Sequence, residues 1–243
     1  MKLRLHLRHV VAFLLLNLLV SELHELAHIS LGGLVCGCFG PRTFNLWQTC
    51  AACAHPTLTP LVTAAGPLLS YAGMWLGLAG MYSSRPQRRG FGFSLLFASL
   101  PFARIFTVLI GGGDELVIVR TLLTGSAWLP AGLWLMKGLV LLLAGLPLLL
   151  AYRRIRNPRP LLWVAGFAVG PLLFQFGYLF QLMNGLLQQG FLAEPWLLGT
   201  PLLVTLHTAL VASLLLLLGR NLSTVNATVC PLERAEPLGL AYP

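Results

Sequence analysis

Residues 21–28 read Ser-Glu-Leu-His-Glu-Leu-Ala-His and lie at the end of a long apolar stretch. On an α-helix His24 and His28 are one turn apart on the same face, at the spacing that two ligands of one Zn²⁺ ion require. Glu25 follows His24, where its carboxylate can reach a water at the metal without becoming a ligand. The string is His-Glu-x-x-His, a pattern that binds zinc with its glutamate as general base.

The composition is that of an integral membrane protein. Hydrophobic residues make up 57% of the chain and charged residues 9%, whereas a soluble domain has about 25% charged residues. A helix needs roughly 20 apolar residues to cross a bilayer. Six stretches meet this length, at residues 10–33, 58–82, 91–123, 131–152, 161–183 and 198–219. We therefore expect an all-α polytopic protein with about six transmembrane helices, surrounded by the lipid bilayer.

The net charge of +9 comes from Lys and Arg residues that mostly flank these stretches. In a soluble protein this charge would suggest a nucleic-acid partner, but here the cations lie in short segments between apolar spans. The alternate segments, 34–57, 124–130 and 184–197, contain a single cation, Arg42. The positive-inside rule then predicts a multi-pass protein with both termini in the cytoplasm and no nucleic-acid partner.

A cysteine-rich loop follows the first span, which we expect to end at Gly32-Gly33. The loop holds four of the five cysteines: Cys36, Cys38, Cys50 and Cys53. On the non-cytoplasmic side they most simply form one or two disulfides, and the alternatives are a second zinc site or free thiols. Residues 42–49 alternate polar and apolar side chains, so we expect a short hairpin strand that can pair with an extended peptide.

The third span contains charged residues inside an apolar segment. Asp114 is the only aspartate of the chain, and it lies between the triple glycine at 111–113 and Glu115. Carboxylates within a membrane are rare and are usually functional or paired. One interpretation is an ion pair of either carboxylate with a cation: Arg104, Arg120 or Lys137. The other is that the glycines interrupt the helix so that Asp114 or Glu115 reaches the metal, and the sequence leaves both open.

These segments together resemble the site-2 protease family of intramembrane zinc metalloproteases. That family has a three-helix core: one helix with His-Glu-x-x-His, a second with a Gly-Pro-x-x-Asn type sequence, and a third that brings an aspartate to the zinc. Residues 66–70 here read Gly-Pro-Leu-Leu-Ser, with Ser70 in place of the asparagine, and the third motif is reduced to Gly113-Asp114-Glu115. The resemblance covers residues 10–123.

The resemblance implies that His24, His28 and Asp114 bind the zinc ion and that Glu25 is the catalytic residue. The implied activity is that of a zinc-dependent metalloendopeptidase, which hydrolyses peptide bonds of membrane-embedded or membrane-proximal protein or peptide substrates. The alternative is a non-proteolytic metal-binding scaffold or a transporter that uses the same buried cluster. A pseudo-protease would be expected to lose Glu25, and a transporter would carry ionisable residues in more spans.

The chain is expected to divide into three parts. Residues 1–123 form the metalloprotease-like core with the cysteine-rich loop at 34–57, and residues 124–219 add three further spans. Residues 220–243 are polar and contain prolines, so we expect a flexible tail.

Overall fold

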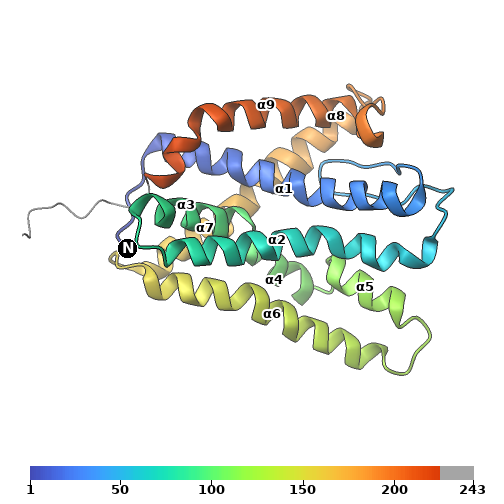
Figure 1. Cartoon of the computed structure of the whole chain (residues 1–243), viewed down its shortest axis with the longest axis horizontal. Helices are drawn as coiled ribbons and strands as arrows, with labels where there is room; N and C mark the ends of the chain where they lie inside the picture. The colour runs from blue at the N-terminus through green and yellow to red at the C-terminus, as the bar shows by residue number, and fades with distance from the viewer. Residues whose placement is uncertain (225–243) are drawn as a thin grey trace, which may run out of the picture.

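The computed structural model describes residues 1–224 and consists of helices joined by loops (Figure 1). Within this part of the chain there is no strand, and six helical segments are long and apolar enough to cross a membrane: Leu7–Cys36, Pro56–Met81, Pro86–Leu109, Leu129–Arg154, Pro160–Gln188 and Leu202–Ser223. The all-α class and the presence of six helices able to cross a membrane are therefore confirmed, but the third of them ends at Leu109 and not at residue 123. Most of the predicted tail lies outside the described residues.

The helices begin where the sequence permits it. Proline occupies the first turn of α2, α3, α4, α6 and α7, where its missing N–H would have no partner in any case. The α-helices are α1 (Leu7–Cys36), α2 (Thr59–Met81), α3 (Pro86–Ala98), α4 (Pro101–Leu109), α5 (Asp114–Leu122), α6 (Leu129–Arg154), α7 (Pro160–Gln175), α8 (Asn184–Gln188) and α9 (Leu202–Leu218). A π-helix, η2 (Phe176–Met183), joins α7 to α8, and three short 3₁₀ segments are η1 (Pro56–Leu58), η3 (Leu197–Gly199) and η4 (Gly219–Ser223).

The third predicted span is broken twice. Leu100 adopts a left-handed conformation (φ 56°) between α3 and α4, directly before Pro101. Gly111 and Gly113 both have φ of 88° between α4 and α5, a region that glycine enters without steric cost. The triple glycine thus interrupts the helix, as predicted, and α5 begins at Asp114.

The first span does not end at Gly32-Gly33. Helix α1 continues to Cys36 and is capped by Gly37 (φ 72°), whose N–H donates to the Gly33 carbonyl at 2.9 Å. Gly33 serves packing instead, because a Cβ there would lie 2.2 Å from the Phe39 ring. The glycine pair is therefore a contact surface, and the helix ends one turn later.

The predicted hairpin strand at 42–49 is also absent. Arg42 and Trp47 form one isolated antiparallel bridge, closed by Thr43 N–H to the Leu46 carbonyl (2.8 Å) and Gln48 N–H to the Pro41 carbonyl (3.1 Å). Only four residues separate the bridged pair, so the turn consumes the length that a strand needs. The segment is a tight loop in place of a strand.

Aromatic packing fixes three helices near the chain ends. The Phe167 ring of α7 contacts Phe13 of α1 at 5.1 Å and Phe93 of α3 at 4.7 Å between centroids, both in edge-to-face geometry. Phe93 and Phe97 are fully buried. Edge-to-face pairs add specificity to apolar burial, so these contacts hold α1, α3 and α7 in one arrangement.

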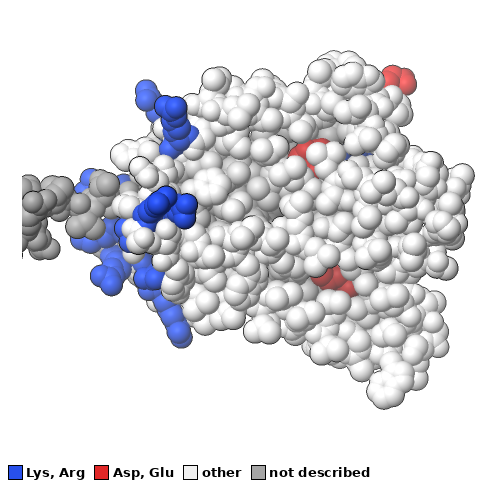
Figure 2. Space-filling model, viewed as in Figure 1, with Lys and Arg blue, Asp and Glu red and all other residues white. Residues whose placement is uncertain are grey.

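Most Lys and Arg side chains gather at one end of the molecule, the end that holds the N-terminus (Figures 1 and 2). The Met1 amino group donates to the Arg154 carbonyl, and the Ser94 hydroxyl donates to the Leu222 carbonyl at 3.0 Å. The two ends of the described chain therefore meet at this basic end. The cysteine-rich loop lies at the opposite end (Figure 1).

Candidate metal centre

Helix α1 presents His24 and His28 on one face. Their Nε2 atoms lie 3.1 Å apart, and the two residues are 6% and 0% exposed. Buried polar groups persist only where hydrogen bonds or a bound ion compensate them. The partners of the two rings therefore decide what this site can do.

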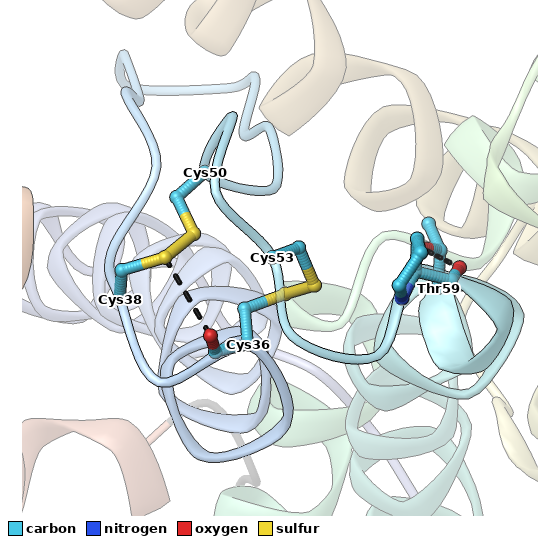
Figure 3. Close-up of a disulfide and its surroundings, with 6 residues drawn as sticks. Cys36, Cys38, Cys50, Cys53 and Thr59 are labelled. Atoms are coloured by element: carbon cyan, nitrogen blue, oxygen red, sulfur yellow. Dashed lines mark hydrogen bonds between the residues drawn. A yellow bond between two sulfur atoms is a disulfide. The ribbon is translucent and has the colours of Figure 1, made fainter.

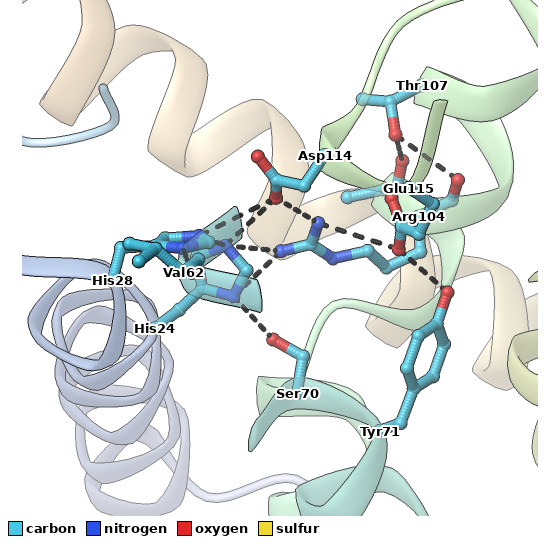
Figure 4. Close-up of polar contacts among 10 residues, drawn as sticks. His24, His28, Val62, Ser70, Tyr71, Arg104, Thr107, Asp114 and Glu115 are labelled. Carbon is cyan, nitrogen blue, oxygen red and sulfur yellow. Dashed lines mark hydrogen bonds and ion pairs between the residues drawn. The ribbon is translucent and has the colours of Figure 1, made fainter. Parts of the chain in front are cut away.

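Helix α2 orients both rings. The Val62 carbonyl accepts a hydrogen bond from Nδ1 of His28 at 2.9 Å, so the proton of this ring is on Nδ1 and Nε2 carries a lone pair. The Ser70 hydroxyl lies 3.0 Å from Nδ1 of His24. Gly66 permits this approach, because a Cβ there would lie 2.3 Å from His28 Nε2. Residues 62–70 of α2, which include the Gly-Pro-x-x-Ser segment, thus position the two imidazoles (Figure 4).

The start of α5 brings Asp114 to the histidines. Its Oδ2 atom lies 3.2 Å from Nε2 of His24 and 3.8 Å from Nε2 of His28. The three side chains each offer a ligand atom, and these atoms lie within 4.8 Å of one another. Glu115 contacts neither histidine and accepts a hydrogen bond from the Tyr71 hydroxyl at 2.8 Å instead. Of the two carboxylates that the sequence left open, Asp114 is the one beside the imidazoles.

The spacing of these donor atoms fits a zinc ion. Tetrahedral zinc with bonds of about 2.0–2.1 Å keeps its ligand atoms about 3.3 Å apart. The three distances here are 3.1, 3.2 and 3.8 Å. Two imidazoles and one carboxylate are also the type of ligand set that catalytic zinc sites use, with a further position left open. The group can therefore hold a metal, although the identity of the metal stays a prediction.

A guanidinium lies against the same donor atoms. Arg104 Nη1 donates to Asp114 Oδ2 at 3.0 Å, and Nη2 lies 2.9 Å from both Nδ1 and Nε2 of His24. The side chain is 15% exposed and its Nη1 is also 3.8 Å from Glu115 Oε1. The ion pair of Asp114 with Arg104, which the sequence offered as an alternative, is thus present together with the two histidines (Figure 4).

Glu25 is buried beside the cluster, and its Oε2 atom has no hydrogen-bond partner in the described chain. Together with His24, Asp114 and Arg104 it lines a cavity of about 800 Å³. A buried carboxylate oxygen without a partner is costly unless it serves another group. Its position suits the role predicted for it, a base beside the metal, which stays a prediction.

The loop at 45–49 forms one wall of this cavity. The Trp47 indole stacks on the His28 ring, with 4.6 Å between centroids and an angle of 14°. Trp47 makes no backbone hydrogen bond within the described residues. The loop therefore covers His28 and presents, next to the cluster, backbone groups without hydrogen-bond partners in the described chain.

Two disulfides fix this loop. Cys36 pairs with Cys53 and Cys38 pairs with Cys50 (Figure 3). The disulfide prediction is confirmed, and the alternative of a second zinc site built from the four thiolates is not supported. The bridges close segments of 17 and 12 residues, which restricts how far Trp47 can move from His28.

Buried polar contacts also hold the loop against the helices. Arg42 Nη2 donates to both carboxylate oxygens of Glu22 at 2.8 and 2.7 Å. The Phe44 N–H donates to Asn184 Oδ1 at 3.2 Å, and the Phe44 ring lies edge-to-face to His207. These contacts link the loop to α1, α8 and α9.

The sequence singled out His24, His28, Glu25 and Asp114, and the fold brings all four to one site. The sequence reasoning did not find the roles of Ser70 and Trp47 toward the histidines. The signals for Ser70 were its place at the asparagine position of the Gly-Pro-x-x-Asn type sequence and its spacing, four residues after Gly66 on the same face of α2. No local pattern links Trp47 to His28. Their contact depends on the two disulfides, which fix the loop, and not on their spacing along the chain.

No protein-family model, curated protein or solved structure matches this chain. Its function is therefore proposed from the site itself.

Proposed function

We propose that this chain is a zinc-dependent metalloendopeptidase that cleaves membrane-embedded or membrane-proximal peptides, as the resemblance to the site-2 protease family implies. One observation carries the proposal: His24, His28 and Asp114 lie together, and His24, Asp114 and Glu25 line a cavity of about 800 Å³. A ligand set with zinc-like spacing next to a carboxylate without a partner, in a space large enough for a peptide segment, fits hydrolysis better than metal storage.

The chemistry divides between the metal and Glu25. His24, His28 and Asp114 would hold the zinc ion, which when bound would supply Lewis-acid activation of water and of the peptide carbonyl. The Glu25 carboxylate accepts the proton of the attacking water and passes it to the leaving nitrogen. Val62 and Ser70 hold the imidazoles in the orientation that this reaction needs.

The substrate must be extended when it is cut, because the hydrogen bonds of a helix shield its peptide bonds. The backbone groups of Trp47 can pair with such a segment by strand addition, since they make no hydrogen bond within the described chain. The loop at 45–49 lines the cavity, so a peptide paired with it would pass the cluster. A transmembrane helix that unwinds locally is the expected substrate class.

The basic end of the molecule supports a cytoplasmic location for both ends of the described chain. The cysteine-rich loop then faces the opposite, oxidising side, where disulfides persist. His28, about two turns before the disulfide at Cys36, would lie toward that side. The catalytic cavity is thus proposed to open nearer the exterior face.

The test compares wild-type protein with Glu25→Gln and with the double variant His24→Ala, His28→Ala, each purified in detergent. Zinc is measured by elemental analysis, and peptide products are measured by mass spectrometry after incubation with labelled transmembrane peptides in liposomes. We expect about one zinc per chain in wild type and in Glu25→Gln, with products from wild type alone. The histidine variant should lose both.

Two outcomes would contradict the proposal. Wild type without zinc would remove the metal site, and products from Glu25→Gln would remove the assigned base. Zinc in wild type without products from any peptide would favour the alternative, a metal-binding scaffold or transporter.

A further inference from the structure

We propose that Arg104 is a positioning residue whose guanidinium has two alternative positions. It leaves the metal ligands and moves to Glu115 when the metal binds. This inference rests on the proposed metal site. It assigns a role to a side chain that the peptidase proposal does not use, and it predicts that Arg104 and Glu115 together set the affinity for the metal.

In the first position, beside Asp114 and His24, Arg104 occupies electron pairs that the metal requires. A guanidinium has only N–H donors. Its Nη1 donates to Oδ2 of Asp114 at 3.0 Å, and its Nη2 lies 2.9 Å from both ring nitrogens of His24, Nδ1 and Nε2. Asp114 and His24 both belong to the ligand set. The guanidinium therefore occupies Oδ2 of Asp114 and the space beside the His24 ring that a metal on these ligands would need.

The second position of the guanidinium, beside Glu115, is close to the first. Arg104 Nη1 already forms an ion pair with Glu115 Oε1 at 3.8 Å, and a small rotation of the side chain would bring the two atoms to hydrogen-bond distance. Glu115 is 4% exposed, and its Oε2 atom is buried without any partner in the described chain. A buried carboxylate oxygen without a partner is costly. A second guanidinium hydrogen bond at Glu115 would remove this cost.

Charge supplies the driving force. A dication next to a guanidinium in a surrounding of low dielectric constant is strongly repelled. Arg104 also lines the cavity, so the side chain has room to move away from the ligands. Glu115 carries the opposite charge and is held in place by the Tyr71 hydroxyl at 2.8 Å. Metal binding should therefore shift Arg104 toward Glu115.

The experiment measures zinc affinity by competition with a chromophoric chelator on the full chain in detergent. The variants are Arg104→Met, Glu115→Gln and their combination, and the control is Arg120→Met. Arg120 donates to the Gly111 carbonyl at 2.7 Å and contacts none of the ligands. All variants are first compared with wild type by size-exclusion chromatography and thermal unfolding.

We expect Arg104→Met to bind zinc about tenfold or more tightly than wild type, in the usual range of coupling between two sites. Glu115→Gln should bind zinc more weakly, because the displaced guanidinium loses its receiver. In the Arg104→Met background, Glu115→Gln should have little further effect, since the two changes act through one contact. Arg120→Met should match wild type.

Weaker or unchanged zinc binding by Arg104→Met would overturn the inference while leaving the metal site intact, because Arg104 would then only anchor Asp114. Absence of zinc from both wild type and Arg104→Met would overturn the proposed function as well. If Arg104→Met does not fold, Arg104→Lys replaces it. A lysine ammonium lacks the planar fork by which a guanidinium bonds two groups at once, so tighter zinc binding than wild type is expected, and weaker binding overturns the inference.

Discussion

Gly66 of α2 lies so close to His28 of α1 that a Cβ atom at position 66 would stand 2.3 Å from Nε2 of the imidazole. The same atom would lie 2.6 Å from Nε2 of His24. Small residues allow helices to approach closely in membranes. Here the close approach also brings the α2 groups of Val62 and Ser70 within hydrogen-bond distance of both rings.

Gly66→Ala is therefore expected to remove the metal without unfolding the helices. The added methyl must displace rings that Val62 and Ser70 hold in place, so the Nε2 atoms can no longer converge. Elemental analysis should show a fall from about one zinc per chain toward zero. The matched control is Gly138→Ala in α6, where a Cβ meets nothing within 4 Å. Full zinc content in Gly66→Ala would contradict the close contact.

Ser70→Ala should weaken zinc binding by about 10- to 100-fold, the usual cost of losing a partner that orients a ligand histidine. The hydroxyl of Ser70 is 3.0 Å from Nδ1 of His24, and alanine removes this contact. Chelator competition measures the change. Ser213→Ala is the control, because its hydroxyl bonds only the Ala209 carbonyl on an exposed part of α9. Equal affinities in the two variants would refute the role of Ser70.

The buried pair of Glu22 and Arg42 yields a stability prediction. Arg42→Met alone should lower the free energy of unfolding by about 3–5 kcal/mol, because it leaves the Glu22 carboxylate buried without a counter-charge. The double variant Glu22→Leu, Arg42→Met should regain most of this loss. Denaturant titration in detergent, followed by circular dichroism, measures both. A double variant that is less stable than Arg42→Met would show that the pair is not the cause.

Removing the disulfides should destabilise the loop and spare the metal. Each pair replaced by serine is expected to cost about 2–4 kcal/mol, since each bridge closes a short segment. Zinc content should stay at that of wild type, because the ligands come from α1 and α5. Reduction of wild type with a phosphine should reproduce the loss of stability. Loss of zinc from the cysteine variants would instead indicate thiolate ligands.

Topology can be tested with single cysteines in a Cys230→Ser background. Ser84→Cys lies in the segment between α2 and α3, and Ala127→Cys lies in the segment between α5 and α6. An impermeant maleimide added to intact cells should label position 127 and not position 84. Lysed cells should label both. The opposite pattern would reverse the proposed orientation and move the disulfides into the cytoplasm.

The amino-acid sequence by itself determined the membrane class, the six spans and the pair His24 and His28 on one helix face. These features depend on local composition and on the helical repeat, which act between neighbours along the chain. It also indicated the break before Asp114, because three glycines in succession favour a departure from helix. The sequence-based prediction was wrong about the end of α1, where Gly33 packs against Phe39 and the helix continues. It was also wrong about the strand at 42–49, where the segment is a tight loop fixed by two disulfides.

Only the tertiary structure decided which groups meet the imidazoles. Asp114 is 90 residues from His24 and Arg104 is 80, and nothing local distinguishes Asp114 from Glu115 as the neighbour of the cluster. The choice follows from the direction in which α5 leaves the glycine break, and this is set by packing against α2 and α6. The position of Trp47 over His28 likewise follows from cross-links between distant cysteines. Contacts of this kind have no periodicity along the chain, so only the folded arrangement reveals them.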